Sequence, residues 1–174
     1  LIKDGIVVLN KAYGYHTYQQ RIASRNEDLY DLASITKISG PLPCLMRLTD
    51  EGYFDYTKTW GDYWPSLRKN EKGLLTMEEI LAHQAGLTAW IPFWKHTYRD
   101  NQQARWWTYR LENVRKYTLP VADHLYLHER YRPKVYAWIR KSPLEEKKEY
   151  RYSGLAFYMF PNIIQNLSDI DYQE

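Results

Sequence analysis

The nine residues Leu29-Tyr30-Asp31-Leu32-Ala33-Ser34-Ile35-Thr36-Lys37 decide how this sequence is interpreted. They contain the pattern Ser-x-x-Lys, in which Ser34 lies three residues before Lys37. On a helix, side chains three residues apart share a face, with about 5–6 Å between their Cβ atoms, so the amine can reach the hydroxyl. A serine needs such a neighbouring base to act as a nucleophile. The stretch predicts a nucleophilic serine, and the alternative is a helix cap followed by a surface lysine.

A second match to the same pattern, Ser66-Leu67-Arg68-Lys69, shows that chance alone supplies it easily. The surroundings separate the two matches. Ser34 lies between apolar residues on both sides, which is typical of the start of a buried helix. Ser66 is followed by a polar run that ends at Gly73, which is typical of a solvated loop. Of the two matches, Ser34 with Lys37 is the better candidate for a catalytic pair, although the pattern alone still favours a helix cap and a surface lysine.

Length and cysteine content limit the classes of protein. The 174 residues suit one domain or a piece of one. The single Cys44 excludes an internal disulfide and a cysteine metal cluster, and its apolar neighbours favour a buried packing role. No run of 18 apolar residues is present. The chain opens on Leu1 without an initiator Met or a basic-then-apolar leader, so we expect a processed or excised piece.

Charge is distributed unevenly along the chain. Residues 95–151 hold 14 Lys/Arg against 7 Asp/Glu, whereas the remainder holds 10 against 14. This asymmetry predicts an anionic partner near the basic segment. Within it, cations alternate with aromatic residues, as in stacking grooves for single-stranded nucleic acid or sugars; the residues are Arg105, Trp106, Trp107, Tyr109, Arg110, Arg115 and Lys116. We favour the alternative, a helix with an aromatic face and a solvated basic face.

Local signals predict the first elements. Residues 6–9 and 12–15 are expected to pair as a β-hairpin. The helix that carries Ser34 should run to Gly52, with a break near residues 40–43 where Gly and Pro occur.

A capping box opens the next predicted helix. Thr76 is followed three residues later by Glu79, and Gly86 is expected to end the helix. Residues 102–141 are compatible with helix, with breaks near residues 119–120 and 132–133.

The C-terminal part carries two further signals. His124 and His128 are four residues apart, which on a helix suits metal hydrolysis, but the glutamate of His-Glu-x-x-His and a third ligand are missing, so we disfavour this alternative. Ser153 is expected to cap a helix that begins near Gly154 and is interrupted by Pro161.

Several segments in the same order resemble one family, the serine β-lactamase and penicillin-binding-protein superfamily, in its class C-like and esterase-like branch. The matching segments are residues 4–8 with Gly14-Tyr15, residues 29–37, residues 48–52, residues 76–87 with His83-Gln84-Ala85-Gly86-Leu87, and residues 150–160. The aromatic residues 89–93 and the insert after them resemble secreted members from gut-type Bacteroidetes.

The resemblance implies a role for each matching residue. Ser34 would be the acylated nucleophile and Lys37 its proton partner. Tyr152 would act as the general base and then the general acid, and the backbone N–H of Ser34 would supply half of an oxyanion hole. Without the resemblance, Tyr152 is one aromatic among 17 tyrosines. His83, at the predicted end of a helix, is expected to be structural and to bond nearby backbone.

Two departures from the family pattern matter. The second motif usually ends in Asn or Asp, whose side chain helps hold the lysine and the substrate amide, but Gly154 stands there. The third motif, Lys or His followed by Thr or Ser and Gly, is absent, and the chain ends at Glu174 before the strand that would carry it. We therefore expect a fragment with an incomplete site.

These observations predict an α+β fold of the β-lactamase/transpeptidase type, with an antiparallel sheet, flanking helices and a helical subdomain, incomplete at its C-terminus. Residues 1–174 form a single partial domain. Residues 1–30 are assigned to the first strands and a loop, 31–52 to the nucleophile helix, 53–149 to the helical subdomain and insert, and 150–174 to the second motif and the following helix.

The resemblance implies a serine hydrolase that acts through an acyl-enzyme on an amide or ester, such as a β-lactam, a D-alanyl peptide or a simple ester. The alternative is a catalytically inactive member or fragment that binds peptidoglycan or a partner. No cofactor, metal, nucleic acid or membrane span is implied, and the expected partner is a small-molecule or peptidoglycan-like substrate. The expected location is the periplasm or the cell surface.

Overall fold

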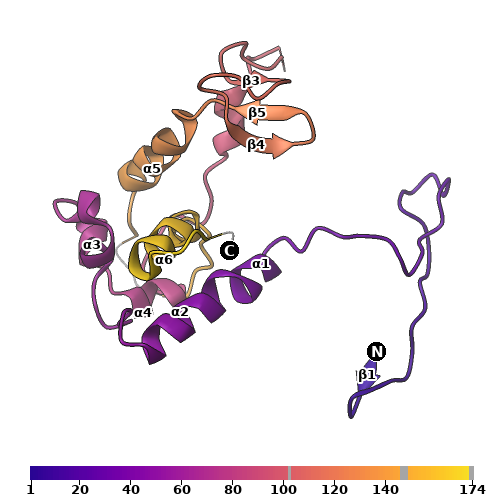
Figure 1. Ribbon diagram of the computed structural model, residues 1–174, viewed down its shortest axis with the longest axis horizontal. Coiled ribbons are helices and arrows are strands. Elements are labelled where there is room, and N and C mark those ends of the chain that lie inside the picture. The colour runs from indigo at the N-terminus through magenta and orange to yellow at the C-terminus, as the bar shows by residue number, and fades with distance from the viewer. Residues whose placement is uncertain (102, 146–148, 173–174) are drawn as a thin grey trace. The chain divides into compact units, whose positions relative to one another are not determined.

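The computed structural model describes residues 1–101, 103–145 and 149–172. The chain, traced in Figure 1, divides into two compact units, Leu1–Thr36 and Lys37–Glu174. Helix α1 (Ile35–Ser39) crosses the boundary between them. Within the described part of the chain, no helix has the length and apolar character needed to cross a membrane.

A two-residue turn organises the start of the first unit. Strand β1 (Ile2–Lys3) pairs antiparallel with β2 (Ile6–Val7), so the prediction that residues 6–9 pair with residues 12–15 is wrong. The turn residues Asp4 and Gly5 have φ values of 50° and 78°. Positive φ at both central residues matches the twist of the flanking strands, and Asp-Gly is a preferred sequence there. Residues 6–7 are therefore the second strand of the hairpin, whereas they were expected to be the first.

Glycine and proline define the first long helix of the second unit. Helix α2 (Pro41–Asp50) follows α1 after Gly40, which confirms the predicted break near residues 40–43. Pro41 is the first residue of α2. The N–H at this position has no acceptor within the helix, so proline, which lacks that N–H, costs the helix no hydrogen bond. Gly52, with φ of 79°, lies just beyond the helix and confirms the predicted stop, because glycine adopts this conformation without steric cost.

Four short helical segments follow; they are α3 (Trp60–Tyr63), the 3₁₀ helices η1 (Pro65–Leu67) and η2 (Glu71–Leu74), and α4 (Met77–Leu81). Thr76 and Glu79 form the predicted capping box of α4: the Glu79 N–H donates to Thr76 Oγ1 at 3.2 Å, and the Thr76 N–H donates to Glu79 Oε2 at 3.0 Å. The helix ends at Leu81, earlier than the predicted stop at Gly86.

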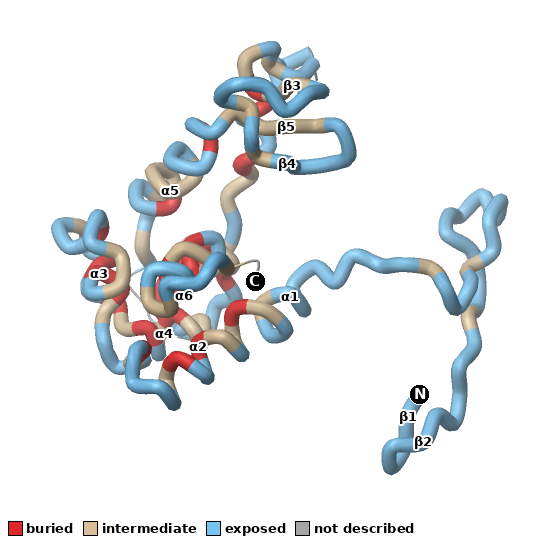
Figure 2. Tube along the Cα trace, viewed as in Figure 1, coloured by how far each residue is buried: buried red, intermediate tan, exposed pale blue. Residues whose placement is uncertain are grey.

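The hydrophobic core of the second unit lies among α2, α3, α4 and α6 (Phe160–Ser168), where Figure 2 shows the buried segments. Helices α2 and α6 pack against each other. Cys44 is half-buried and packs against this core. The buried side chains at its centre are Leu45, Trp60, Leu67, Met77, Ile80, Ile139, Met159, Phe160 and Ile163.

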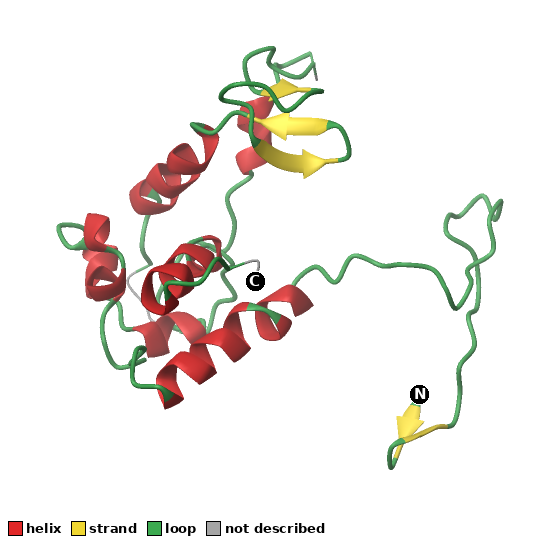
Figure 3. Cartoon of the chain, in the orientation of Figure 1, coloured by secondary structure: helices red, strands yellow, loops and turns green. Residues whose placement is uncertain are grey.

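A small antiparallel sheet replaces part of the predicted helix in residues 102–141, as Figure 3 shows. Its strands are β3 (Tyr109–Arg110), β4 (Leu119–Ala122) and β5 (Leu125–Leu127), in the order β3-β5-β4. Pro120 lies on the edge strand β4, where a proline breaks no ladder hydrogen bond that the sheet needs. With the surrounding helices, the sheet confirms the predicted α+β class.

Among the described residues of this region, helix α5 (Tyr131–Lys141) forms as predicted, but it runs through Arg132 and Pro133, where a break was expected. A buried lysine stabilises its C-terminal end. Lys72, with no exposed surface, donates from Nζ to the carbonyl oxygens of Arg140, at 3.2 Å, and of Ser142. A positive charge is favourable at a helix C-terminus, whose last carbonyls lack helical partners. Burial lowers the pKa of Lys72 from its usual value.

The C-terminal segment begins with a tight turn. The predicted helix near Gly154 is a 3₁₀ helix, η4 (Ala156–Tyr158), and α6 follows it. Pro161 was predicted to interrupt the helix, but it lies in the first turn of α6. Proline is tolerated there because the first N–H groups of a helix have no internal acceptor.

Candidate active site

Ser34 lies directly before the first residue of α1 and follows a tight turn. The Ala33 N–H donates to Asp31 Oδ1 at 2.7 Å, and the Ile35 N–H donates to the Leu32 carbonyl at 2.9 Å. Ala33 has a φ of 45°, a left-handed conformation that costs a non-glycine residue roughly 1–3 kcal/mol. The residue next to the predicted nucleophile is therefore strained. Backbone strain of this kind is concentrated at functional sites, which makes it a reason to examine Ser34.

Lys37 and Tyr152, two of the predicted site residues, lie together in the second unit. The Lys37 Nζ is 5.5 Å from the centroid of the Tyr152 ring and 5.6 Å from that of Phe157. Lys37 is half-buried, whereas Tyr152 is 44% exposed. The structure therefore brings two of the three predicted site residues together, with the Lys37 ammonium over the Tyr152 ring.

His83 contacts the backbone on both sides of Tyr152. Its carbonyl oxygen accepts the Arg151 N–H at 2.8 Å, and its Nδ1 accepts the Ser153 N–H at 3.3 Å. Its ring centroid is 4.5 Å from that of Tyr152. Its backbone adopts a φ of 57° just after α4. These contacts agree with the predicted structural role and link His83 to Tyr152, a link that no spacing in the sequence indicates.

Ser153 fixes the same segment from the other side. It is buried, and its Oγ donates to the Thr88 carbonyl at 2.8 Å and accepts the Leu155 N–H at 3.3 Å. This hydroxyl therefore satisfies a backbone donor ahead of η4, in place of the predicted cap of a helix near Gly154. With Ser153 directed inward, the neighbouring Tyr152 keeps an exposed ring.

Gly154, which stands where the family pattern has Asn or Asp, faces Lys37. A Cβ atom added at Gly154 would lie 3.5 Å from Lys37 Cε and 3.7 Å from Nζ, which is ordinary van der Waals contact. A polar side chain at this position would therefore touch the lysine. The glycine leaves that side of Lys37 without a side-chain neighbour from position 154.

The two histidines of the disfavoured metal alternative lie at different places around the small sheet. His124 lies in the turn between β4 and β5 with a φ of 49°, and His128 follows β5. The two residues are therefore not on one helical face, and the geometric premise of the metal alternative is wrong. Among the residues that the structure describes, no group of three or more His, Cys, Asp or Glu side chains is placed to hold a metal ion.

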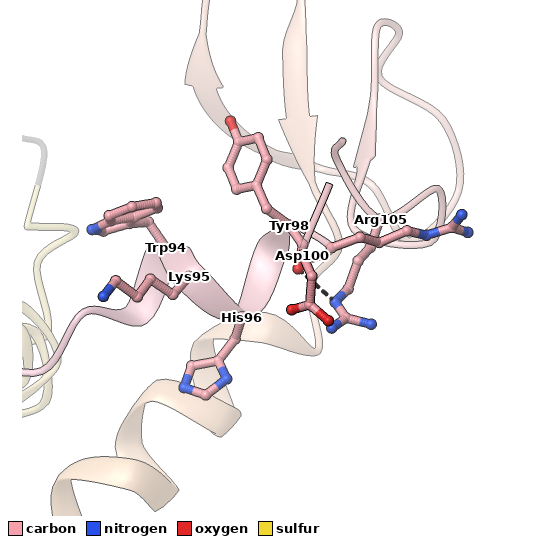
Figure 4. A pocket seen from close by; sticks show the side chains of 7 residues that line it. Trp94, Lys95, His96, Tyr98, Asp100 and Arg105 are labelled. Atoms are coloured by element: carbon pink, nitrogen blue, oxygen red, sulfur yellow. Dashed lines mark hydrogen bonds between the residues drawn. The ribbon is translucent and has the colours of Figure 1, made fainter. Parts of the chain in front are cut away.

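The aromatic and basic residues after Phe93 line two cavities rather than one helical face. The larger cavity, of about 710 Å³, is shown in Figure 4 and lies along η3 (Phe93–Thr97) and the loop after it. Its lining combines the aromatic residues Trp94 and Tyr98 with the cations Lys95, Arg99 and Arg105 and the carboxylate of Asp100. The prediction of a helix with an aromatic face and a solvated basic face over residues 105–116 is wrong, because turns and strand β3 occupy these residues.

In the smaller cavity, of about 260 Å³, cations cover the ring faces. The Lys134 Nζ lies 4.5 Å from the centroid of the Trp107 ring. The Arg110 guanidinium lies 4.6 Å from the centroid of the Tyr117 ring. The Trp94 ring of the larger cavity has a longer contact of the same kind, with Lys95 Nζ 5.9 Å from its centroid.

Two curated proteins resemble parts of this chain in sequence. Protein flp of Staphylococcus aureus is 28% identical over 90 residues, which are 50% of this chain and 18% of flp. Esterase/beta-lactamase LipL of Mycobacterium tuberculosis is 43% identical over 42 residues, 24% of this chain and 10% of LipL. The chain therefore matches less than a fifth of the length of either relative.

A solved structure supports the fold. The class C beta-lactamase of Rhodobacter sphaeroides superposes with a TM-score of 0.53 at 19% identity, over 91% of this chain and 36% of that enzyme. The family model described as Beta-lactamase matches residues 1–174, the whole of this sequence. This match shows that the chain belongs to the beta-lactamase family.

Proposed function

We propose that this chain carries the nucleophile and the proton-transfer residues of a serine hydrolase that forms an acyl-enzyme on an amide or ester. The observation that carries the proposal is the Lys37 ammonium 5.5 Å from the Tyr152 ring, in a chain whose Ser34 precedes Lys37 by three residues. Membership of the beta-lactamase family supports a serine hydrolase function in general.

In the proposed reaction, Ser34 Oγ attacks the carbonyl carbon of the substrate and forms a C–O bond. Tyr152 takes the hydroxyl proton, with Lys37 stabilising the phenolate by its charge. The tetrahedral intermediate collapses as the C–N or C–O bond of the substrate breaks, and the same proton passes to the leaving group. Water then hydrolyses the acyl ester and regenerates Ser34.

We propose a β-lactam, a D-alanyl peptide or a simple ester as substrate, and the periplasm or cell surface as location.

The competing proposal is an inactive family member that binds peptidoglycan or a protein partner. Gly154 supports it, because the polar side chain that would touch Lys37 is missing. Covalent labelling separates the two proposals, because an inactive member retains the fold but not an activated serine.

The test is intact-mass analysis after incubation with a fluorophosphonate and, separately, with a penicillin. We expect one adduct per chain in the wild type and none in Ser34→Ala. The matched control is Ser66→Ala, which removes the exposed serine of the second Ser-x-x-Lys pattern and should label like the wild type. A folded wild type that forms no adduct with either reagent, or an adduct that persists in Ser34→Ala, would refute the enzyme proposal.

The 710 Å³ cavity supports a second function, the binding of an acidic sugar. Three cations suit a carboxylate, and the exposed rings of Trp94 and Tyr98 suit the flat face of a ring. Asp100 adds an exposed carboxylate that can accept hydrogen bonds from sugar hydroxyls. Figure 4 shows Trp94 and Lys95 at one end of this lining and Asp100 and Arg105 at the other, which suits an oligosaccharide.

We expect trigalacturonate to bind at low salt, as measured by calorimetry, and a neutral glucose oligomer not to bind. Arg99→Gln should weaken binding about fivefold, the loss of roughly 1 kcal/mol that an exposed ion pair provides. Arg115→Gln, which removes an exposed cation outside the cavity, should not. Equal loss in both variants, or tighter binding of oligo-dT than of trigalacturonate, would contradict the acidic-sugar proposal.

A further inference from the structure

His83 accepts two hydrogen bonds from the backbone N–H groups of Arg151 and Ser153, the residues on either side of Tyr152. The Arg151 N–H reaches the His83 carbonyl, and the Ser153 N–H reaches the His83 Nδ1. Both donors belong to a stretch without regular secondary structure, so no ladder or helix holds this part of the backbone. The orientation of Tyr152 therefore depends on contacts outside its own segment, and His83 supplies two of them.

The imidazole ring also limits where the Tyr152 ring can lie. The two ring centroids are 4.5 Å apart, at an interplanar angle of 45°. Phe157 closes the other side of the imidazole at 6.0 Å, and Tyr150 lies edge-on at 6.1 Å. A phenol that must exchange a proton beside Lys37 has to stay within a few tenths of an ångström of its productive position. His83 is placed to supply this restraint.

The contact with Ser153 exists only while Nδ1 of His83 carries a lone pair. A neutral imidazole with its proton on Nε2 accepts the Ser153 N–H, whereas an imidazolium has N–H groups at both nitrogens and cannot accept. We propose, building on the hydrolase function proposed above, that His83 is the positioning residue for Tyr152 and that its protonation releases the Tyr152 segment, so that acid switches the site off.

The groups around His83 set the pH at which its imidazole becomes protonated. Burial is the largest cause and lowers the pKa of His83 from its usual value near 6.5, and the positive charge of Lys37 lowers it further; the hydrogen bond with the Ser153 backbone acts in the opposite direction but does not outweigh burial. The rings of Tyr150 and Tyr152 also face His83, and the Arg151 side chain is paired with Glu145. The stabilising contact is therefore complete above about pH 6.5 and is lost as the pH falls through the lowered pKa.

Two substitutions separate positioning from packing. His83→Asn keeps an acceptor near the place of Nδ1, tolerates a φ of 57° and does not titrate. His83→Leu keeps apolar volume but removes the acceptor. We expect His83→Leu to slow fluorophosphonate adduct formation roughly 10–100-fold at pH 7.5, and His83→Asn to stay within about threefold of the wild type. The wild-type rate should fall below pH 6.5 with an acid limb that is absent in His83→Asn.

Hydrogen exchange supplies a readout that needs no activity. Corrected for intrinsic rates, the amides of Arg151 and Ser153 should lose protection in the wild type as the pH falls, but not in His83→Asn. If the wild type forms no adduct, the hydrolase proposal fails and the exchange experiment still tests His83. If His83→Asn behaves like His83→Leu, or the acid loss of protection persists in His83→Asn, the positioning proposal is overturned.

Discussion

Tyr152→Phe is expected to slow the acylation of Ser34 by penicillin roughly 10²–10⁴-fold, the usual contribution of a general base or acid. The substitution removes one hydroxyl and keeps the ring that contacts His83 and Lys37. The segment should therefore fold as before while losing the group that carries the proton. Time-resolved intact-mass analysis measures the rate directly.

The leaving group makes this experiment specific. The amine released from a penicillin needs a proton, whereas p-nitrophenolate leaves without one. If Tyr152 returns the proton, Tyr152→Phe should slow acylation by penicillin more than acylation by a p-nitrophenyl ester.

Tyr150→Phe is the matched control, because Tyr150 is also exposed, lies two residues away and contacts the same imidazole. It should react like the wild type. Equal losses in the two variants, or an equal loss with both substrates, would assign the proton transfer elsewhere.

Gly73→Ala is expected to destabilise the second unit by about 3 kcal/mol or more, at the upper end of the cost of overpacking. A Cβ atom at Gly73 would lie 2.2 Å from the Leu67 carbonyl oxygen and 2.8 Å from its carbon. Both atoms are backbone, so no side chain can move aside. The carbonyl of Gly73 also faces Gly61, where an added Cβ would lie 2.9 Å away.

Thermal denaturation followed by circular dichroism measures the effect, and about 3 kcal/mol corresponds to a Tm lower by roughly 6–12 °C for a protein of this size. Gly154→Ala is the control, because an added Cβ there meets only ordinary contacts and its stability should stay within about 1 kcal/mol of the wild type. A Gly73→Ala variant as stable as Gly154→Ala would show that the η1–η2 packing can shift at little cost.

Short-range signals in the sequence predicted several elements correctly. The capping box of Thr76 and Glu79, the break at Gly40 and the stop at Gly52 each depend on residues within one or two helical turns. Such interactions act between chain neighbours, so the order of residues is enough to predict them.

Predictions failed where a segment suits two kinds of structure. Residues 102–141 contain both helix-forming and strand-forming residues, and the three strands form because β5 pairs with β3 and with β4. The hairpin at residues 2–7 failed differently: the Asp4-Gly5 turn was present in the sequence, but we assigned its following strand to the wrong partner.

By itself, the sequence determined the class of fold and the family, because Ser-x-x-Lys, the capping box and the Tyr152 segment occur in one order along the chain. Only the tertiary structure decided that Lys37 lies by Tyr152, that His83 holds Tyr152 on both sides, and that Lys72 stabilises the end of α5. These contacts join residues far apart in sequence. Their formation depends on how the helices pack around a shared core, and residue spacing carries no information about that packing.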